Sequence, residues 1–119
     1  MGTMHEVDSL KVSQLDYLIA EAEGIWYVRT LDDFIIRVTE DNQLFYTTKG
    51  GRSFPFSPCI DWRQGGAIIE KNNISVMRVA EGWEANCNGA AVAQGNTPLL
   101  AAMRTRIKMK YGGTVELDE

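Results

Sequence analysis

The sequence predicts a single α+β domain over residues 1–119, in which an N-terminal and a C-terminal helix pack on an antiparallel sheet. Two segments near the ends of the chain carry apolar residues at helical spacing. The segments between them are short and rich in β-branched and aromatic residues, apart from one short helical segment that follows a long loop. A length of 119 residues suits one domain with one hydrophobic core.

The first helix is expected to begin at Ser13 and to end at Gly24. Ser13 and Asp16 form a variant of the capping box, in which the hydroxyl and the carboxylate accept hydrogen bonds from free amides of the first turn. Val12 and Tyr17 have the spacing of a hydrophobic staple. Gly24 suits the left-handed conformation that ends many helices. The apolar stripe of this helix consists of Leu15, Leu18, Ile19 and Ala22.

Three strands are expected next, at Ile25–Arg29, Phe34–Thr39 and Leu44–Thr48, because these segments are rich in Ile, Val, Thr, Phe and Tyr. Turn residues separate them, which predicts an antiparallel meander. Two glycines and two prolines within Lys49–Pro58 then predict a long loop.

A short helix is expected to follow that loop. Asp61 can accept hydrogen bonds at its start. The pair Gly65-Gly66 is expected to interrupt it, and a helical turn is expected to restart at Ala67 and to run to about Lys71.

The rest of the chain is expected to form strands and the final helix. The strands are Ile74–Val79, Trp83–Cys87 and Ala90–Gln94, with a turn at Asn88-Gly89. Thr97 is expected to cap the final helix, with Pro98 in its first position and Gly112-Gly113 at its end. Its apolar flank consists of Leu99, Leu100, Met103, Ile107 and Tyr111.

Charge and composition argue against several classes of protein. With 16 acidic and 12 basic residues, the net charge of −4 argues against a broad nucleic-acid surface, which needs a basic excess. Residues 1–10 lack the apolar core of a signal peptide, and no apolar run approaches the roughly 20 residues that span a bilayer. We therefore expect a cytoplasmic protein without a membrane partner, in which Cys59 and Cys87 are free, buried thiols. Residues 1–10 are expected to be flexible, and residues 114–119 to form an acidic tail.

The chain shows no pattern typical of a catalytic, metal or cofactor site. The only histidine, His5, lies near an end that is expected to fray, which is a poor position for activating a nucleophile. Cys59 and Cys87 are 28 positions apart and lack the ligand spacing of a zinc site. No glycine motif typical of phosphate or dinucleotide binding occurs. We therefore expect a non-enzymatic protein without a metal or cofactor.

Two segments resemble the signatures of a known family. FSPCIDWRQGGAIIE, residues Phe56–Glu70, and GNTPLLAAMR, residues Gly95–Arg104, are similar to segments of the NinX-like proteins of bacteriophages. Lys11–Gly24 and the final residues, Gly112–Glu119, also have counterparts in that family, whereas Ile25–Ser53 matches poorly.

The resemblance implies a phage or prophage accessory protein, but no biochemical activity, because the family has no established one. Arg63 and Ala67 stand where the family usually has Ala and Pro, so a role of Arg63 would belong to this protein alone. We expect a module that binds an unknown host or phage protein. The alternatives are a nucleic-acid-associated regulator that uses the final helix, and a small anion-binding or ligand-binding domain centred on residues 61–70.

The motif supplies the candidate ligand or partner surface: Asp61, Trp62, Arg63, Gln64, Gly65, Gly66 and Glu70. Trp62 is predicted to pack within the domain, and the alternative is an exposed anchor for a partner. Free amides after Gly65-Gly66, beside Arg63, would attract an anion. Asp61 and Glu70 could act as paired carboxylates, but a helix cap and a solvated side chain explain them more simply.

The final helix carries four cations and no acidic residue, and its basic side chains are Arg104, Arg106, Lys108 and Lys110. Cations near a helix C-terminus complement the helix dipole, and the acidic tail could fold back on them. The alternative is a surface for nucleic acid or for an acidic protein. At 100° per residue the four cations do not share one face, so we expect no useful affinity for duplex nucleic acid.

Overall fold

The structure, a computed structural model, describes residues 2–23, 34–38, 44–48 and 53–118. These residues form the helices α1 (Val12–Ala22), α2 (Trp62–Asn72) and α3 (Pro98–Tyr111), together with one 3₁₀ turn, η1 (Val7–Ser9). All strand pairs are antiparallel. The predicted α+β class is therefore confirmed.

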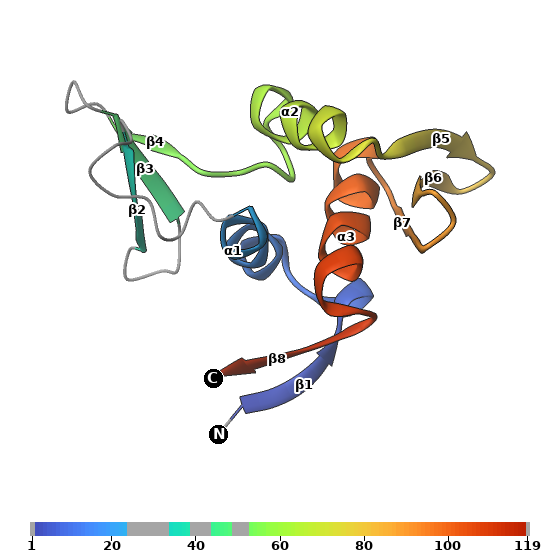
Figure 1. The fold of residues 1–119 in the computed structure, drawn as a ribbon, viewed down its shortest axis with the longest axis horizontal. Coiled ribbons are helices and arrows are strands. Elements are labelled where there is room, and N and C mark those ends of the chain that lie inside the picture. Colours follow the sequence, from blue (N-terminus) through green and yellow to red (C-terminus); the bar gives the residue numbers. More distant parts are fainter. Residues whose placement is uncertain (1, 24–33, 39–43, 49–52, 119) are drawn as a thin grey trace.

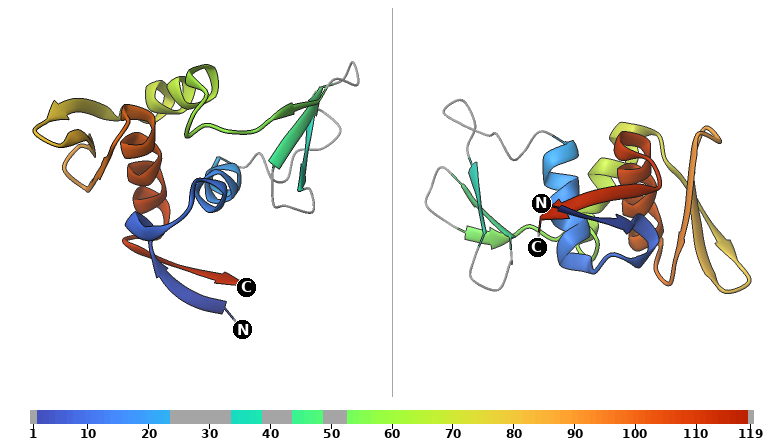
Figure 2. Two further views of the ribbon diagram at one scale, coloured as in Figure 1. Left: turned by 180° about the vertical axis from the view of Figure 1, so that it is seen from behind. Right: turned by 90° about the horizontal axis from the view of Figure 1, so that it is seen from below.

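The strands are divided among three small sheets that surround the helices (Figure 1). One sheet contains β5 (Ser75–Val79), β6 (Gly82–Cys87) and β7 (Ala91–Gly95), and it packs on α3. A second contains β2 (Phe34–Val38), β3 (Leu44–Thr48) and β4 (Ser53–Pro55), and the third pairs β1 (Gly2–Glu6) with β8 (Thr114–Asp118). The prediction of a single sheet is therefore wrong for the described residues, whose strands form three sheets. Among these residues, β2–β4 pair with one another and β5–β7 pair with one another, and helices lie between the two groups (Figure 2).

Helix α3 is the centre of the core, and local signals predicted it well. The Thr97 hydroxyl accepts a hydrogen bond from the Leu100 amide at 3.1 Å, and Pro98 occupies the first position. Gly112 follows its last residue with a φ of 90°. Thr105 is fully buried and donates its hydroxyl proton to the Ala85 carbonyl at 3.1 Å, which ties the helix to β6. The buried apolar residues of α3 are Leu99, Ala101, Ala102, Met103 and Ile107.

Helix α1 buries Leu15, Leu18 and Ile19 of the predicted apolar stripe, with Ala20 in place of Ala22, and it has a different start. It begins at Val12, and the Lys11 amide donates to Oε1 of Gln14 at 2.9 Å. The prediction that Ser13 and Asp16 form a capping box, with Val12 as the staple, is therefore wrong. Asp16 is instead buried and accepts a hydrogen bond from the Cys59 amide at 3.2 Å. The end predicted at Gly24 lies outside the described residues, which show Ala22 as the last helical residue.

Helix α2 runs without interruption through Gly65-Gly66, so the predicted break and restart at Ala67 are wrong. The glycine at 65 allows close packing instead. A Cβ there would lie 2.3 Å from the Pro58 carbonyl oxygen and 2.6 Å from a methyl carbon of Leu99. The predicted cap is confirmed, since the Asp61 carboxylate accepts from the Arg63 amide at 2.9 Å.

The strands of the second half follow the prediction, with the turn between β6 and β7 at Asn88 and Gly89, whose φ angles are 53° and 76°. The predicted strands at Phe34–Thr39 and Leu44–Thr48 are present as β2 and β3. The prediction for Ile25–Arg29 lies outside the residues that the structure describes. Within the predicted loop Lys49–Pro58, the short strand β4 pairs with β3.

Two segments near the chain ends pair with each other as β1 and β8, and they belong to the parts of the chain that were expected to be flexible (residues 1–10) and to form an acidic tail (residues 114–119). Residues run in register from Gly2 opposite Asp118 to Glu6 opposite Thr114. The Val7 amide donates to the Gly113 carbonyl at 3.0 Å. Val115 is buried while Glu116 is exposed, so the alternating pattern of the tail gives it one face for the core. Figures 1 and 2 show both termini side by side at the end of this ribbon.

Among the helices of the described ranges, none is long and apolar enough to cross a bilayer.

Candidate functional site

The segment between β4 and α2 is fixed in place by the side chain of Gln64. Its Oε1 accepts from the Ser57 amide at 2.7 Å, and its Nε2 donates to the Pro55 carbonyl at 3.0 Å. The same nitrogen donates to Oδ2 of Asp61 at 3.2 Å. One amide side chain on the first turn of α2 therefore bonds three points of the preceding loop and fixes its shape.

Asp16 anchors the same loop from the side of α1. Its carboxylate is 4% exposed and accepts from the Cys59 amide at 3.2 Å. Burial raises the pKa of Asp16 to about 6, although hydrogen bonds from the thiol and the amide of Cys59 oppose the shift. Burial, followed by the nearby carboxylate, raises the pKa of the Cys59 thiol far above its usual range. Cys59 and Cys87 are both free and buried, as predicted from the sequence.

We expect Asp16→Asn to stabilise the protein at pH 7 by up to about 2–3 kcal/mol. The native carboxyl has a pKa of about 6 against a reference of 3.8, so the native state binds more protons between these values. Stability therefore falls as pH rises from about 4 to 6 and then stays level. Asparagine keeps an oxygen for the Cys59 amide and removes the buried charge. Urea unfolding of both proteins between pH 4 and 7.5 measures the difference, and an Asp16→Asn protein that is less stable throughout this range would contradict the prediction.

Two large apolar side chains are exposed where this fixed loop meets α2. Ile60 is 71% exposed and Trp62 is 58% exposed. Both line a groove of about 470 Å³ whose other walls include Pro55 and Ser57. The prediction that Trp62 packs within the domain is therefore wrong. With Asp61 as the cap, Trp62 is the first residue of α2 and lies to the side of the buried stripe of Gly65 and Ile68.

The second glycine of the motif lies beneath the indole ring. A Cβ on Gly66 would meet Cε3 of Trp62 at 3.8 Å, an ordinary contact. Trp62 and Gly66 are one helical turn apart, so they share a flank of α2. The two adjacent glycines thus have different surroundings: Gly65 faces the core, and Gly66 faces the Trp62 side chain.

The other motif residues do not form a chemical centre. The Arg63 side chain is 87% exposed, and its Nε lies 3.7 Å from Oδ1 of Asp61. Glu70 is exposed, and nine residues of helix place it about 13 Å along the axis from Asp61. The two carboxylates are therefore not paired. Because α2 is continuous, the amides after Gly65-Gly66 lie inside the helix and are not the free amides of a new helix start on which the expected anion site depended. At the actual start of α2, the amides of Arg63, Gln64 and Gly65 all donate to Asp61.

The sequence model of a family described as Bacteriophage P22, NinX matches residues 6–110. The chain belongs to this family. No curated protein matches the chain. The match covers the whole of α1, α2 and the fixed loop, and nearly all of α3, so the structure shows what the NinX motif does locally. Gln64, Gly65 and Asp61 shape the loop, and the shaped loop exposes Ile60 and Trp62.

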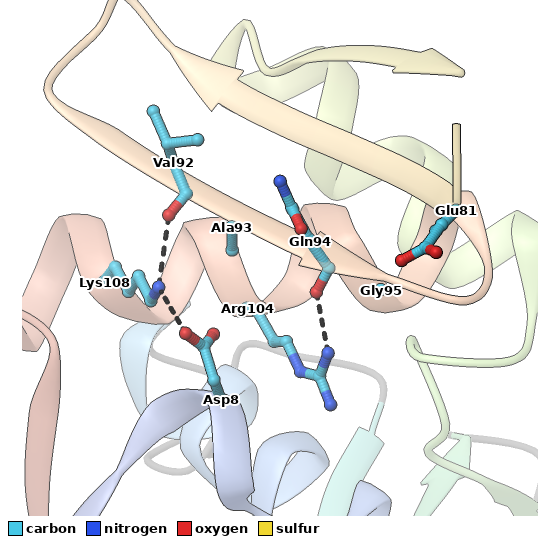
Figure 3. Close-up of a pocket in the computed structure, with 8 residues that line it drawn as sticks. All are labelled: Asp8, Glu81, Val92, Ala93, Gln94, Gly95, Arg104 and Lys108. Carbon is cyan, nitrogen blue, oxygen red and sulfur yellow. Dashed lines mark hydrogen bonds and ion pairs between the residues drawn. The ribbon is translucent and has the colours of Figure 1, made fainter. Parts of the chain in front are cut away.

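In this NinX family member three of the four cations of the predicted basic surface bond within the protein, and Figure 3 shows two of them, Arg104 and Lys108. Arg104 donates from Nη1 to the Gln94 carbonyl at 2.7 Å. Lys108 donates from Nζ to the Val92 carbonyl at 3.1 Å and pairs with Asp8 at 3.0 Å. These contacts line a second groove of about 470 Å³ beside β7.

Arg106 lies on a different side of α3 and joins it to α1. Its Nε lies 2.5 Å from Oε2 of Glu23, and its Nη2 donates to the Ala22 carbonyl at 3.0 Å. Lys71 pairs with Oε1 of Glu23 at 3.0 Å. Burial alone would raise the pKa of Glu23, but the hydrogen bonds and charges of Arg106 and Lys71 outweigh it and lower that pKa. Sequence reasoning missed Glu23, because its partners lie 48 and 83 positions away.

Proposed function

We propose that this NinX family member is a non-enzymatic phage accessory protein of the host cytoplasm, which binds a protein partner through the apolar groove at the start of α2. The groove is lined by Pro55, Ser57, Ile60, Asp61, Trp62, Arg63 and Gln64. The exposure of Ile60 and Trp62 within the family motif supports this proposal most directly. An indole that stays exposed to water contributes little to the stability of the fold, so its exposure is better explained by contact with a partner.

The groove has the properties of a binding hot spot. Tryptophan and arginine are the side chains most often found to dominate protein interfaces, and both are present here in exposed positions. The loop that presents them is already fixed by Gln64 and by Asp16. A partner would therefore bind without first ordering the loop, which removes one of the usual costs of association.

The chemistry of the groove defines the partner. Ile60 and Trp62 provide apolar walls for one apolar side chain of a partner segment. Arg63 places a guanidinium at the rim, where its Nε lies 3.7 Å from Oδ1 of Asp61, its one ion-pair partner among the residues that the structure describes. We therefore infer a partner that presents an apolar side chain beside a carboxylate. Since the family usually has Ala at the position of Arg63, the carboxylate preference would be specific to this protein.

We expect Trp62→Ala to change the free energy of unfolding by less than about 1 kcal/mol, as for exposed side chains in general, but to abolish partner binding. A quantitative pull-down from infected cells would compare wild type with Trp62→Ala, Arg63→Ala and the control Val92→Ala, which removes a 41% exposed apolar side chain elsewhere. The partner should be retained by the control and lost with Trp62→Ala. The purified partner should bind the Arg63→Ala protein more weakly than wild type but more tightly than the Trp62→Ala protein. Its affinity for the Arg63→Ala protein should no longer depend on salt concentration.

Two results would count against the proposal. A Trp62→Ala protein that unfolds at much lower urea would give the indole a structural role. A partner captured equally by wild type and Trp62→Ala would place its binding surface elsewhere.

The alternative function, a nucleic-acid-associated regulator, is less well supported. Arg104, Arg106 and Lys108 each donate to main-chain carbonyls within the protein, and the last two also pair with acids. A cation that is already hydrogen-bonded gains little from a phosphate. Phosphate contacts dominate nucleic-acid affinity, and the net charge of −4 opposes them.

We therefore expect no duplex DNA or RNA binding with a dissociation constant below about 1 µM near 150 mM salt. Fluorescence anisotropy with labelled duplexes across a salt series measures this directly. Tighter binding that weakens when Arg104 and Lys108 are both replaced by alanine would favour the regulator instead.

A further inference from the structure

The sheet of β5, β6 and β7 has two edges, and the described residues cover only one of them. At the β7 edge, Arg104 donates to the Gln94 carbonyl and Lys108 donates to the Val92 carbonyl (Figure 3). Four residues of helix advance about 6 Å, and two strand residues advance nearly the same distance. Cations four residues apart on α3 therefore match carbonyls two residues apart on β7. This arrangement blocks the edge to another strand.

The same contacts fix the hydrogen-bonding direction of every strand in the sheet. Because the carbonyls of Val92 and Gln94 point away from β6, the residues between them face β6. Alternation then directs the amides and carbonyls of Trp83 and Ala85 toward β7, and those of Glu84 toward β5. On β5 the main-chain groups of Val76 and Arg78 are left pointing away from the sheet.

The β5 edge is open. Among the described residues, no hydrogen bond from another element reaches the main chain of Val76 or Arg78. The side chain of Met77, between them, is 54% exposed. The Arg78 guanidinium lies over the Trp83 ring of the same molecule, 5.5 Å from its centroid, so it does not cover the edge.

We propose that β5 pairs antiparallel with β5 of a second copy of this chain, around a two-fold axis at Met77. The outward groups of Val76 and Arg78 are placed symmetrically about Met77, so each would bond its counterpart across the axis: Val76 with Arg78 of the second copy, and the reverse. The two Met77 side chains would meet on the outer face of the sheet. No like charges would lie directly opposite each other.

The blocked β7 edge explains why this assembly would stop at two copies. A sheet with two open edges can grow indefinitely, whereas one open edge per chain gives a closed, two-fold pair. A five-residue edge strand buries little surface, so the dimer would be weak and would form at high protein concentration.

Sedimentation velocity of the full chain at protein concentrations between about 10 µM and 1 mM tests the proposal. This range suits the weak dimer that is expected of a small interface. The apparent mass of wild type should rise with concentration from 13.3 kDa toward twice that value. Arg78→Pro should remain monomeric, because it removes an outward amide while leaving the ladder to β6 intact. Arg78→Ala is the matched control: it also removes the guanidinium but keeps the amide, and it should dimerise.

A second variant keeps the test decisive if Arg78→Pro fails to fold. Met77→Lys would place two cations against each other at the axis and should abolish the dimer, whereas Val92→Lys on the other edge should not. A wild-type protein that is monomeric at every concentration would overturn the proposal. So would a dimer that persists in Met77→Lys or in folded Arg78→Pro.

Discussion

Arg106→Ala should destabilise the protein by about 3–5 kcal/mol, the range for breaking a buried ion pair from one side. The Arg106 and Glu23 side chains are 12% and 4% exposed, so the substitution would leave a carboxylate buried with Lys71 as its remaining cation. It would also remove the donor to the Ala22 carbonyl at the end of α1. Lys110→Ala, on the exposed surface of the same helix, should change stability by less than about 0.5 kcal/mol.

Urea unfolding of the two variants measures this contrast, and its pH dependence identifies the cause. The pKa of Glu23 is lowered in the native protein, so its contribution to stability is present at neutral pH and is lost as pH falls through the native pKa. The loss caused by Arg106→Ala should therefore shrink in acid. Adding Glu23→Gln should recover part of the lost stability at pH 7. A loss that is the same at pH 3 and pH 7 would mean that packing of the arginine stem, and not the charge, is responsible.

Gly65→Ala should destabilise the protein by about 3 kcal/mol, whereas Gly66→Ala, one residue further, should stabilise it by up to about 1 kcal/mol. The added methyl group at position 65 would lie 2.3 Å from the Pro58 carbonyl oxygen, a main-chain atom that cannot simply rotate away. At position 66 its nearest neighbour would be the Trp62 ring at 3.8 Å. Both glycines lie within α2, so both gain the same helix propensity from alanine.

Thermal and urea unfolding of these two variants needs no partner and no assay of activity. Since the chemical change is identical, their difference isolates the contact with Pro58 and Leu99. Equal stabilities would show that the loop can move away from α2, which would weaken the case for a preorganised groove. In that event the hydrogen bonds of Gln64 would not be sufficient to hold the loop in one position.

The elements that could be predicted from the sequence are those determined by adjacent residues. Thr97 and Pro98 define the start of α3 within one turn, and Asn88-Gly89 defines the turn between β6 and β7. The wrong predictions concern residues whose structure depends on contacts with residues far away in the sequence. Asp16 looked like a capping residue, but its partner Cys59 lies 43 positions away. Gly65 looked like a helix breaker because the atoms that require a glycine belong to Pro58 and Leu99.

The same reasoning explains the candidate sites. Trp62 was predicted to be buried because large aromatics usually are, and nothing in its neighbours shows that the buried stripe of α2 passes beside it. The cations of α3 looked like one surface because the sequence cannot show their partners. Lys108 pairs with Asp8, 100 positions earlier, and Arg106 with Glu23, 83 positions earlier.

The pairing of the two chain ends has a mechanical consequence. Gly2 and Asp118 form the first pair of the β1–β8 ribbon, so a pull on the two ends acts across the strands and not along them. Such a load acts on the hydrogen bonds of one residue pair at a time, so the two strands would separate pair by pair from this end. The two strands should therefore separate at low force, well before α3 and the core around it are strained.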